Sequence, residues 1–238
     1  MAFDSGNRAT TRSALPQVGI DVGLRSYMLR VYNYMTGALA LTGAIAYFTY
    51  SSGLIEQIYG TPLYWVAVFA PLAFVLVLSF GIQKMSLGAA QATFWGYAGV
   101  MGISMSSIFL VYTGASIAEV FFITSATFLA MSLWGYTTKK DLSGFGHFLM
   151  MGLIGIIIAM VVNIFLQSPA IYFAISIIGV LVFTGLTAWD TQRIKELYWD
   201  GDSDVVAGKK SIMGALALYL DFINLFLMLM QLMGNRRS

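Results

Sequence analysis

The chain has no cysteine, a single histidine and very few charged residues. Its 238 residues include 13 Lys and Arg and 11 Asp and Glu, so charged side chains make up only 10%. The absence of cysteine excludes disulfides, iron–sulfur clusters, cysteine-bound zinc and thiol catalysis, and one histidine excludes a histidine metal cluster. A net charge of +2, with no basic patch, gives no support for a nucleic-acid partner.

Apolar residues are abundant. They make up 58% of the chain, and the mean hydropathy is +0.78. Soluble domains carry about 25% charged residues and fewer than half apolar residues. There are too few polar side chains here to cover a water-soluble surface, so the composition predicts an integral membrane protein with the lipid bilayer as its surroundings.

The apolar residues form seven long continuous runs. A helix needs about 20 of them to cross a bilayer, whereas barrel strands are shorter and alternate. We therefore expect an all-α polytopic membrane protein with seven transmembrane helices in one domain, residues 25–238. The expected spans are 31–50, 62–81, 89–112, 117–136, 147–167, 170–189 and 212–233.

Residues 1–24 are expected to form a flexible cytoplasmic tail. They contain no apolar core segment, so they are not a cleaved secretory signal. Asp4 and Asp21, with no amphipathic period, argue against a mitochondrial presequence. These features favour the cytoplasmic membrane of a bacterium, with an internal eukaryotic membrane as the alternative.

The basic residues predict the orientation. If seven helices alternate, eleven of the 13 Lys and Arg fall on the side of the N-terminus, which the positive-inside rule places in the cytoplasm. Arg236 and Arg237 break this pattern. A final helix that crosses fully puts them outside, and one that dips in and returns puts them back inside.

Asp221, in "ALYLDFIN", lies in the middle of the last apolar run. It is about nine residues, or roughly 13 Å, into that span. A charged Asp at such a depth costs about 2.5–3.5 kcal/mol, so it must face the protein interior and have a partner, or be protonated. Asp190, in "GLTAWDTQRI", ends the preceding span and is the expected partner.

Both acids have polar neighbours at helical spacing. Thr187 lies three residues before Asp190, and Asn224 lies three residues after Asp221. Two carboxylates in a low-dielectric site cannot both ionise cheaply, so the pair is expected to share a proton. Protonated, it would pin the two helices together; ionised, it would repel and attract a cation.

Other polar groups are weaker candidates. Lys84 could pair with an Asp, or its side chain could simply reach toward the head groups. The acids of "WDGDSD", Asp200, Asp202 and Asp204, resemble a calcium loop but lack its terminal Glu, so a solvated turn is expected.

The segments "ALYLDFINLFLMLM", "AWDTQRI" and "KKDLSGFGHF" resemble the transmembrane Bax-inhibitor-motif family, over about residues 25–234. The resemblance implies a seven-helix fold with the C-terminal helix at its centre. Bacterial members of that family are pH-sensitive calcium leak proteins controlled by paired aspartates, which match Asp190 and Asp221 here. A basic residue that interacts with the gate corresponds most closely to Lys84, although "GIQKMS" lacks the Arg residues of some relatives.

Three functions are weighed. The first is a pH-controlled calcium leak through a monomer without a cofactor. Asp190, Asp221 and Asn224 offer fewer oxygens than the six to eight of a tight calcium site, so calcium contact would be weak and transient. The second is a binding regulator of a membrane-embedded ATP-dependent protease, as some relatives are. The third, an intramembrane aspartyl protease, is disfavoured because "YLDFI" lacks a glycine beside Asp221, so we expect no enzyme.

Overall fold

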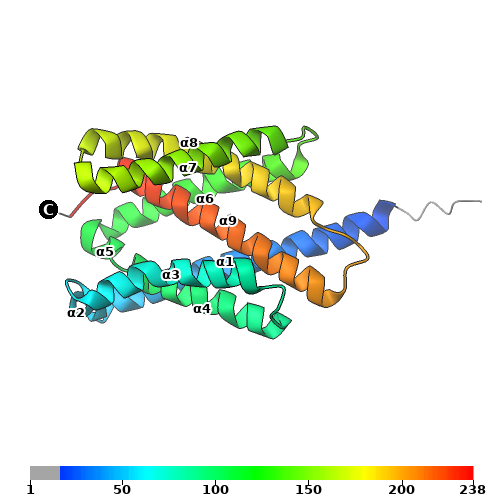
Figure 1. Cartoon of the computed structure of the whole chain (residues 1–238), viewed down its shortest axis with the longest axis horizontal. Coiled ribbons are helices and arrows are strands. Elements are labelled where there is room, and N and C mark those ends of the chain that lie inside the picture. Colours follow the sequence, from blue (N-terminus) through cyan, green and yellow to red (C-terminus); the bar gives the residue numbers. More distant parts are fainter. Residues whose placement is uncertain (1–16, 238) are drawn as a thin grey trace, which may run out of the picture.

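The computed structural model describes residues 17–237, with side chains from residue 22 onward, and consists of helices joined by short connections. Seven of these helices are long, and two short ones, α2 and α5, sit in connections at one end of the bundle (Figure 1). The helices are α1 (Gln17–Ser51), α2 (Leu54–Ile58), α3 (Pro62–Gly81), α4 (Leu87–Met105), α5 (Ile108–Val111), α6 (Gly114–Thr137), α7 (Ser143–Leu166), α8 (Pro169–Glu196) and α9 (Asp204–Met233).

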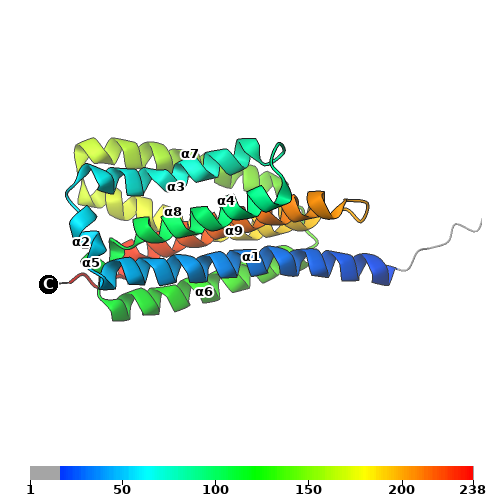
Figure 2. The ribbon, with the colours of Figure 1, turned by 90° about the horizontal axis from the view of Figure 1, so that it is seen from below.

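Six segments of the described chain are long and apolar enough to cross a membrane: α3, α4 with α5, α6, α7, α8 and α9. α1 is the seventh long helix and runs beside them, but Tyr, Thr and Asn side chains interrupt its apolar run (Figure 2). The predicted all-α membrane fold is therefore confirmed. Six of the seven expected spans are apolar enough to cross a membrane, and α1 is the exception because it is less apolar.

α9 is the central helix of the bundle. Within its most apolar segment 67% of the residues are buried, against 11% in α3 and in α7. It packs against α8, α1, α6 and α4, and Figure 1 shows it crossing between the α1, α3 and α4 group and the α7 and α8 pair. The central position that the family resemblance implied for the last helix is confirmed.

Small residues set how closely the helices approach α8. A methyl group placed on Gly135 of α6 would overlap the backbone of Ala188, and one on Gly146 of α7 would overlap the ring of Trp189. Close backbone approach through small residues is a common way to pack helices in lipid. The consequence here is that α8 is fixed tightly between α6 and α7, next to α9.

The third expected span, 89–112, is not one continuous helix. α4 ends at Met105, and α5 begins at Ile108. Between them the hydroxyl of Ser106 donates to the carbonyl of Ile103, and that of Ser107 donates to Ser104. Serine hydroxyls that bond to nearby backbone groups compete with the helical ladder, and these two bonds lie at the break.

The two ends of the bundle differ in charge. The N-terminal part of α1 and the α3–α4, α6–α7 and α8–α9 connections meet at one end, which we call the basic end (Figure 1). Nine of the eleven basic residues predicted to share a side are described. They lie in these segments or in the adjoining ends of α8 and α9: Arg25, Arg30, Lys84, Lys139, Lys140, Arg193, Lys195, Lys209 and Lys210. The other two, Arg8 and Arg12, lie outside the described residues.

The C-terminus lies at the opposite end. α9 is one uninterrupted helix, and after it Arg236 pairs as an isolated bridge with Tyr112, which follows α5. The Arg237 guanidinium donates to the hydroxyl of Tyr50 at 2.6 Å, near the end of α1. The last helix therefore crosses the whole bundle, and the alternative of a helix that dips in and returns is wrong for this fold.

The expected tail, residues 1–24, lies mostly outside the described residues. The part that is described, from Gln17, belongs to α1.

Candidate functional site

Asp221 lies in the interior of the bundle, well away from both ends of α9. Its side chain is only 5% exposed, and within the described chain its Oδ2 atom has no hydrogen-bond partner. The residues around it on the helix, such as Leu218, Phe222 and Leu225, are buried as well. Burying a carboxyl oxygen without a hydrogen-bond partner costs free energy. The charged form of Asp221 is therefore unfavourable unless the group holds a proton or binds a cation.

Asp190 provides the partner that the sequence predicted. α8 and α9 pack along one another, and the two carboxyl groups lie close enough to interact directly. Asp190 is less deeply buried than Asp221. The structure thus brings together two acids that are separated by 31 positions in the chain and sit on neighbouring helices.

Arg193 is the cation that acts on this pair. It lies one turn after Asp190 and interacts with that carboxyl group electrostatically. Its guanidinium also stacks over the ring of Trp189, 5.4 Å from the ring centre. Arg193 is exposed and acts on Asp190, whereas the deeper carboxyl group of Asp221 is acted on by that of Asp190.

The two predicted supporting residues bond within their own helices. The Thr187 hydroxyl donates to the carbonyl of Phe183 at 2.8 Å, and the Asn224 amide donates to the carbonyl of Leu220 at 2.8 Å. Thr187 is fully buried, and Asn224 is partly buried. Their positions beside the acids keep a supporting role open, but their described hydrogen bonds do not reach either carboxyl group.

A chain of hydroxyl groups next to the pair was missed by the sequence. Thr191, adjacent to Asp190, bonds to Ser132 of α6 at 2.9 Å, and Ser132 bonds to Tyr32 of α1 at 2.5 Å. Thr191 and Ser132 are buried. The chain links α8, α6 and α1 at the level of the acids, across separations of 59 and 100 residues.

The connection "TKKDL" is fixed to α8 beside the site. The buried side chain of Gln192 accepts from the amide of Leu142 and donates to the carbonyl of Lys140, each at 2.8 Å. Lys195, one turn later, donates to the carbonyl of Tyr136 at 2.9 Å. In the same connection, the Ser143 amide donates to Asp141 and lowers the pKa of that exposed carboxyl.

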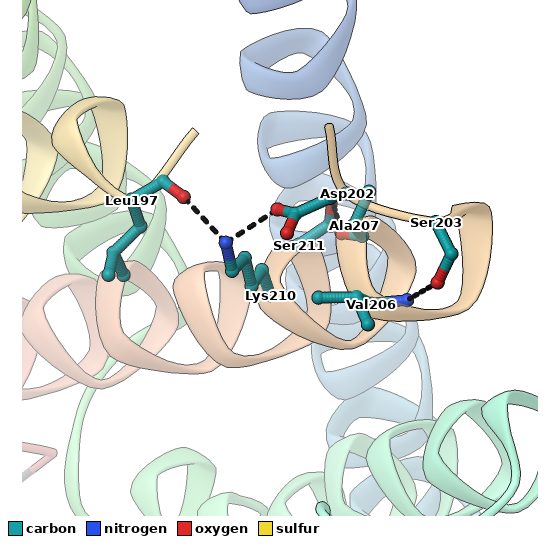
Figure 3. Close-up of polar contacts among 7 residues, drawn as sticks. All are labelled: Leu197, Asp202, Ser203, Val206, Ala207, Lys210 and Ser211. Carbon is teal, nitrogen blue, oxygen red and sulfur yellow. Dashed lines mark hydrogen bonds and ion pairs between the residues drawn. The ribbon is translucent and has the colours of Figure 1, made fainter. Parts of the chain in front are cut away.

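The segment "WDGDSD" precedes α9, and its Asp202 contacts that helix. Lys210 of α9 makes an ion pair with Asp202 and also donates to the carbonyl of Leu197, as Figure 3 shows. The Ser203 hydroxyl accepts from the amide of Val206 and caps α9. Among the described residues there is no group of three or more His, Asp or Glu side chains that could hold a metal ion. The segment therefore joins α8 to α9 through internal contacts.

Comparison with known proteins identifies the family. Residues 24–238 match the family described as "Inhibitor of apoptosis-promoting Bax1". The chain belongs to the Bax inhibitor family. It is 53% identical to a protein of Rickettsia prowazekii, over 92% of this chain and 93% of the relative. It is 49% identical to the inner membrane protein YbhL of Escherichia coli strain K12, over 90% and 94%. A protein of Caulobacter vibrioides is 44% identical over 99% of both chains.

The basic residue expected from the Bax inhibitor resemblance stands apart from the acid pair. Lys84 is exposed in the α3–α4 connection, and within the described residues it forms no ion pair. Instead Lys209 reaches that connection from α9 and donates to the carbonyl of Gln83 at 3.2 Å. In this arrangement α9 is bonded to the α3–α4 connection through a backbone carbonyl, and Lys84 makes no ion pair with either Asp among the described residues.

Proposed function

We propose that this Bax inhibitor family protein is a pH-sensitive calcium leak channel of a bacterial inner membrane, gated by Asp190 and Asp221. The observation that carries the proposal is the buried contact between these two acids on adjacent helices, with one oxygen of Asp221 unpartnered. Ionisable groups inside a membrane are expensive, and they mark ion or proton pathways.

The gate works through the number of protons on the pair. With one proton shared, the carboxyl groups hydrogen bond and hold α8 against α9. When both are ionised, they repel one another and attract a cation. The surrounding charges bias this change, since Arg193 acts on Asp190, while the carboxyl group of Asp190 itself acts on Asp221.

Calcium would be the permeant ion and not a resident cofactor. Calcium binds tightly where six to eight oxygen ligands converge. Two carboxyl groups and the nearby Asn224 amide provide too few. A contact of this strength suits an ion that must leave as readily as it enters.

The proposed orientation places the basic end, including the N-terminus, in the cytoplasm. Support comes from the nine described Lys and Arg residues of that end, against Arg236 and Arg237 at the other. The inner membrane is proposed because YbhL, at 49% identity, is named as an inner membrane protein.

The test is calcium entry into liposomes that contain the purified protein, measured in steps from about pH 5 to pH 8. Asn resembles a protonated Asp. We therefore expect Asp221→Asn to show a leak that no longer depends on pH and equals that of the native protein at the acidic end.

Glu119→Gln is the matched control, because Glu119 is an exposed acid of α6 far from the pair in sequence. This variant should keep the native pH dependence. An unchanged pH response in Asp221→Asn would contradict the proposal. A native protein without any calcium leak would also contradict it, and would favour the alternative of a regulator of a membrane-embedded protease.

A further inference from the structure

A long groove runs along the outside of the bundle between α1 and α6. Its volume is about 1260 Å³, and Phe222 of α9 is part of its lining. Along α1 it extends from Arg25 to Ala44, a length of about 29 Å at 1.5 Å per residue. The hydrocarbon core of a bilayer is about 30 Å thick, so the groove spans most of the depth of the membrane.

The lining of the groove suits a hydrocarbon chain. Most lining side chains are apolar, and among the described residues no acidic side chain lines it. Hydroxyl groups along the groove are already bonded: Tyr32 to Ser132, Thr36 to the carbonyl of Tyr32, and Ser125 to the carbonyl of Phe121. The Tyr136 hydroxyl belongs to the mouth at the basic end. An apolar occupant of the groove between its mouths therefore leaves these three hydroxyl groups satisfied.

The two mouths of the groove differ in charge. At the basic end the groove is lined by the exposed Arg25 and by Tyr136. The ammonium group of Lys195 lies 5.2 Å from the centre of the Tyr136 ring. At the other end the lining residues include Phe109 and Gly114, which are uncharged. Arg237 of that end does not line the groove, and its guanidinium is bonded to the hydroxyl of Tyr50, whose ring stacks on Phe109. A ligand with an anionic head and an apolar tail matches this asymmetry. Lipids of a membrane place their apolar tails at the depth of the groove and their anionic head groups at the level of its basic mouth.

We propose that the groove between α1 and α6 binds an anionic glycerophospholipid. An acyl chain lies in the groove over Phe222, and the phosphate lies between Arg25 and Lys195 at the basic end. This site is separate from the acid pair, and it would exist whether or not the protein conducts calcium.

A lipid fits better than a helix of a partner protein. The hydrogen bond between Tyr32 and Ser132 reaches from α1 to α6 across the groove at 2.5 Å. A helix with its side chains is about 10 Å across, so seating one between α1 and α6 would break this bond. A single extended hydrocarbon chain is much thinner and can lie over it.

Native mass spectrometry tests the proposal. The protein is reconstituted with equal amounts of phosphatidylglycerol and phosphatidylcholine of the same acyl chains, extracted in mild detergent, and its bound lipids are counted. We expect one retained phosphatidylglycerol on the native chain. Arg25→Gln should weaken retention about fivefold, the effect of roughly 1 kcal/mol for one cation at a phosphate.

Gly43→Leu should abolish retention by filling the groove, because a side chain at Gly43 would meet no atom within 4 Å and would project into open space. Gly155→Leu is its control, since Gly155 on α7 is equally open but does not line the groove. Lys139→Gln is the control for Arg25→Gln, because it also removes one positive charge from the basic end but Lys139 does not line the groove. Both controls should retain the lipid.

Three results would overturn the proposal: no phosphatidylglycerol on the native chain, equal retention of phosphatidylcholine, or equal loss in variants and controls. If Gly43→Leu does not fold, as judged by helical circular dichroism and melting, Gly114→Leu takes its place, because Gly114 lines the groove in the same open way.

Discussion

At the scale of single residues, the proposed function depends on where two carboxyl groups are placed. Asp221 is surrounded by apolar side chains, and the carboxyl group of Asp190 acts on it electrostatically. The sequence predicted this pair because both acids interrupt long apolar runs on consecutive helices. The hydroxyl chain of Thr191, Ser132 and Tyr32 could not be predicted, since serine and threonine are common in membrane helices and their partners are distant in sequence.

The close contact of Gly135 with Ala188 gives a residue-scale prediction. Gly135→Ala should lower stability by about 1–3 kcal/mol, because the added methyl group overlaps the α8 backbone and must push α6 away. Thermal unfolding in detergent measures this. Gly155→Ala, which meets no atom within 4 Å, should leave the melting temperature unchanged or slightly raised. Equal melting of the two variants would show that α6 and α8 are not in tight contact.

At the scale of elements, most span positions follow from the apolar runs, but their breaks do not. The expected span 62–81 coincides with α3, whose Pro62 starts the helix. The break between α4 and α5 was missed because the two serines that lie at it are short and stand within an apolar run. α2 was missed because five residues are too few to show helical periodicity.

The anchoring of the α6–α7 connection to α8 gives a prediction at this scale. Gln192→Ala should expose the bonds after Lys139 and Lys140 to trypsin, because the amide of Leu142 and the carbonyl of Lys140 both lose their partner. We expect cleavage there to be about tenfold faster. Gln83→Ala, at an exposed side chain of the α3–α4 connection, is the control. An unchanged cleavage rate in Gln192→Ala would show that the side chain does not hold the connection.

At the scale of the whole molecule, the distribution of the basic residues agrees with the path of the helices through the bundle. The nine described basic residues of the basic end lie opposite the C-terminal pair Arg236 and Arg237, because α9 crosses the bundle completely. The sequence predicted both the charge asymmetry and the full crossing. It could not predict the groove between α1 and α6. The groove depends on the distance between these two helices, which are far apart in sequence, where both pack against α9.

The absence of cysteine makes the orientation directly measurable, because single cysteines can be introduced without background. Ser203→Cys, at the basic end, should react with an impermeant maleimide only after cells are opened. Ser52→Cys and Asn235→Cys, at the other end, should react in intact cells. Labelling of Asn235→Cys and Ser203→Cys from the same side would contradict a crossing α9, and full reversal of the pattern would contradict the proposed orientation.

The central claim is that Asp190 and Asp221 act as one titrating unit, and a double-substitution cycle on the pH-dependent calcium leak tests it most directly. Asp190→Asn, Asp221→Asn and the double variant are compared with the native chain in the same liposomes. If the acids share a proton, either single change removes the pH response and the double change adds nothing further, because interacting groups are not additive. If each single variant keeps a pH response and the double variant loses the sum of the two, the acids titrate independently and the paired gate is wrong.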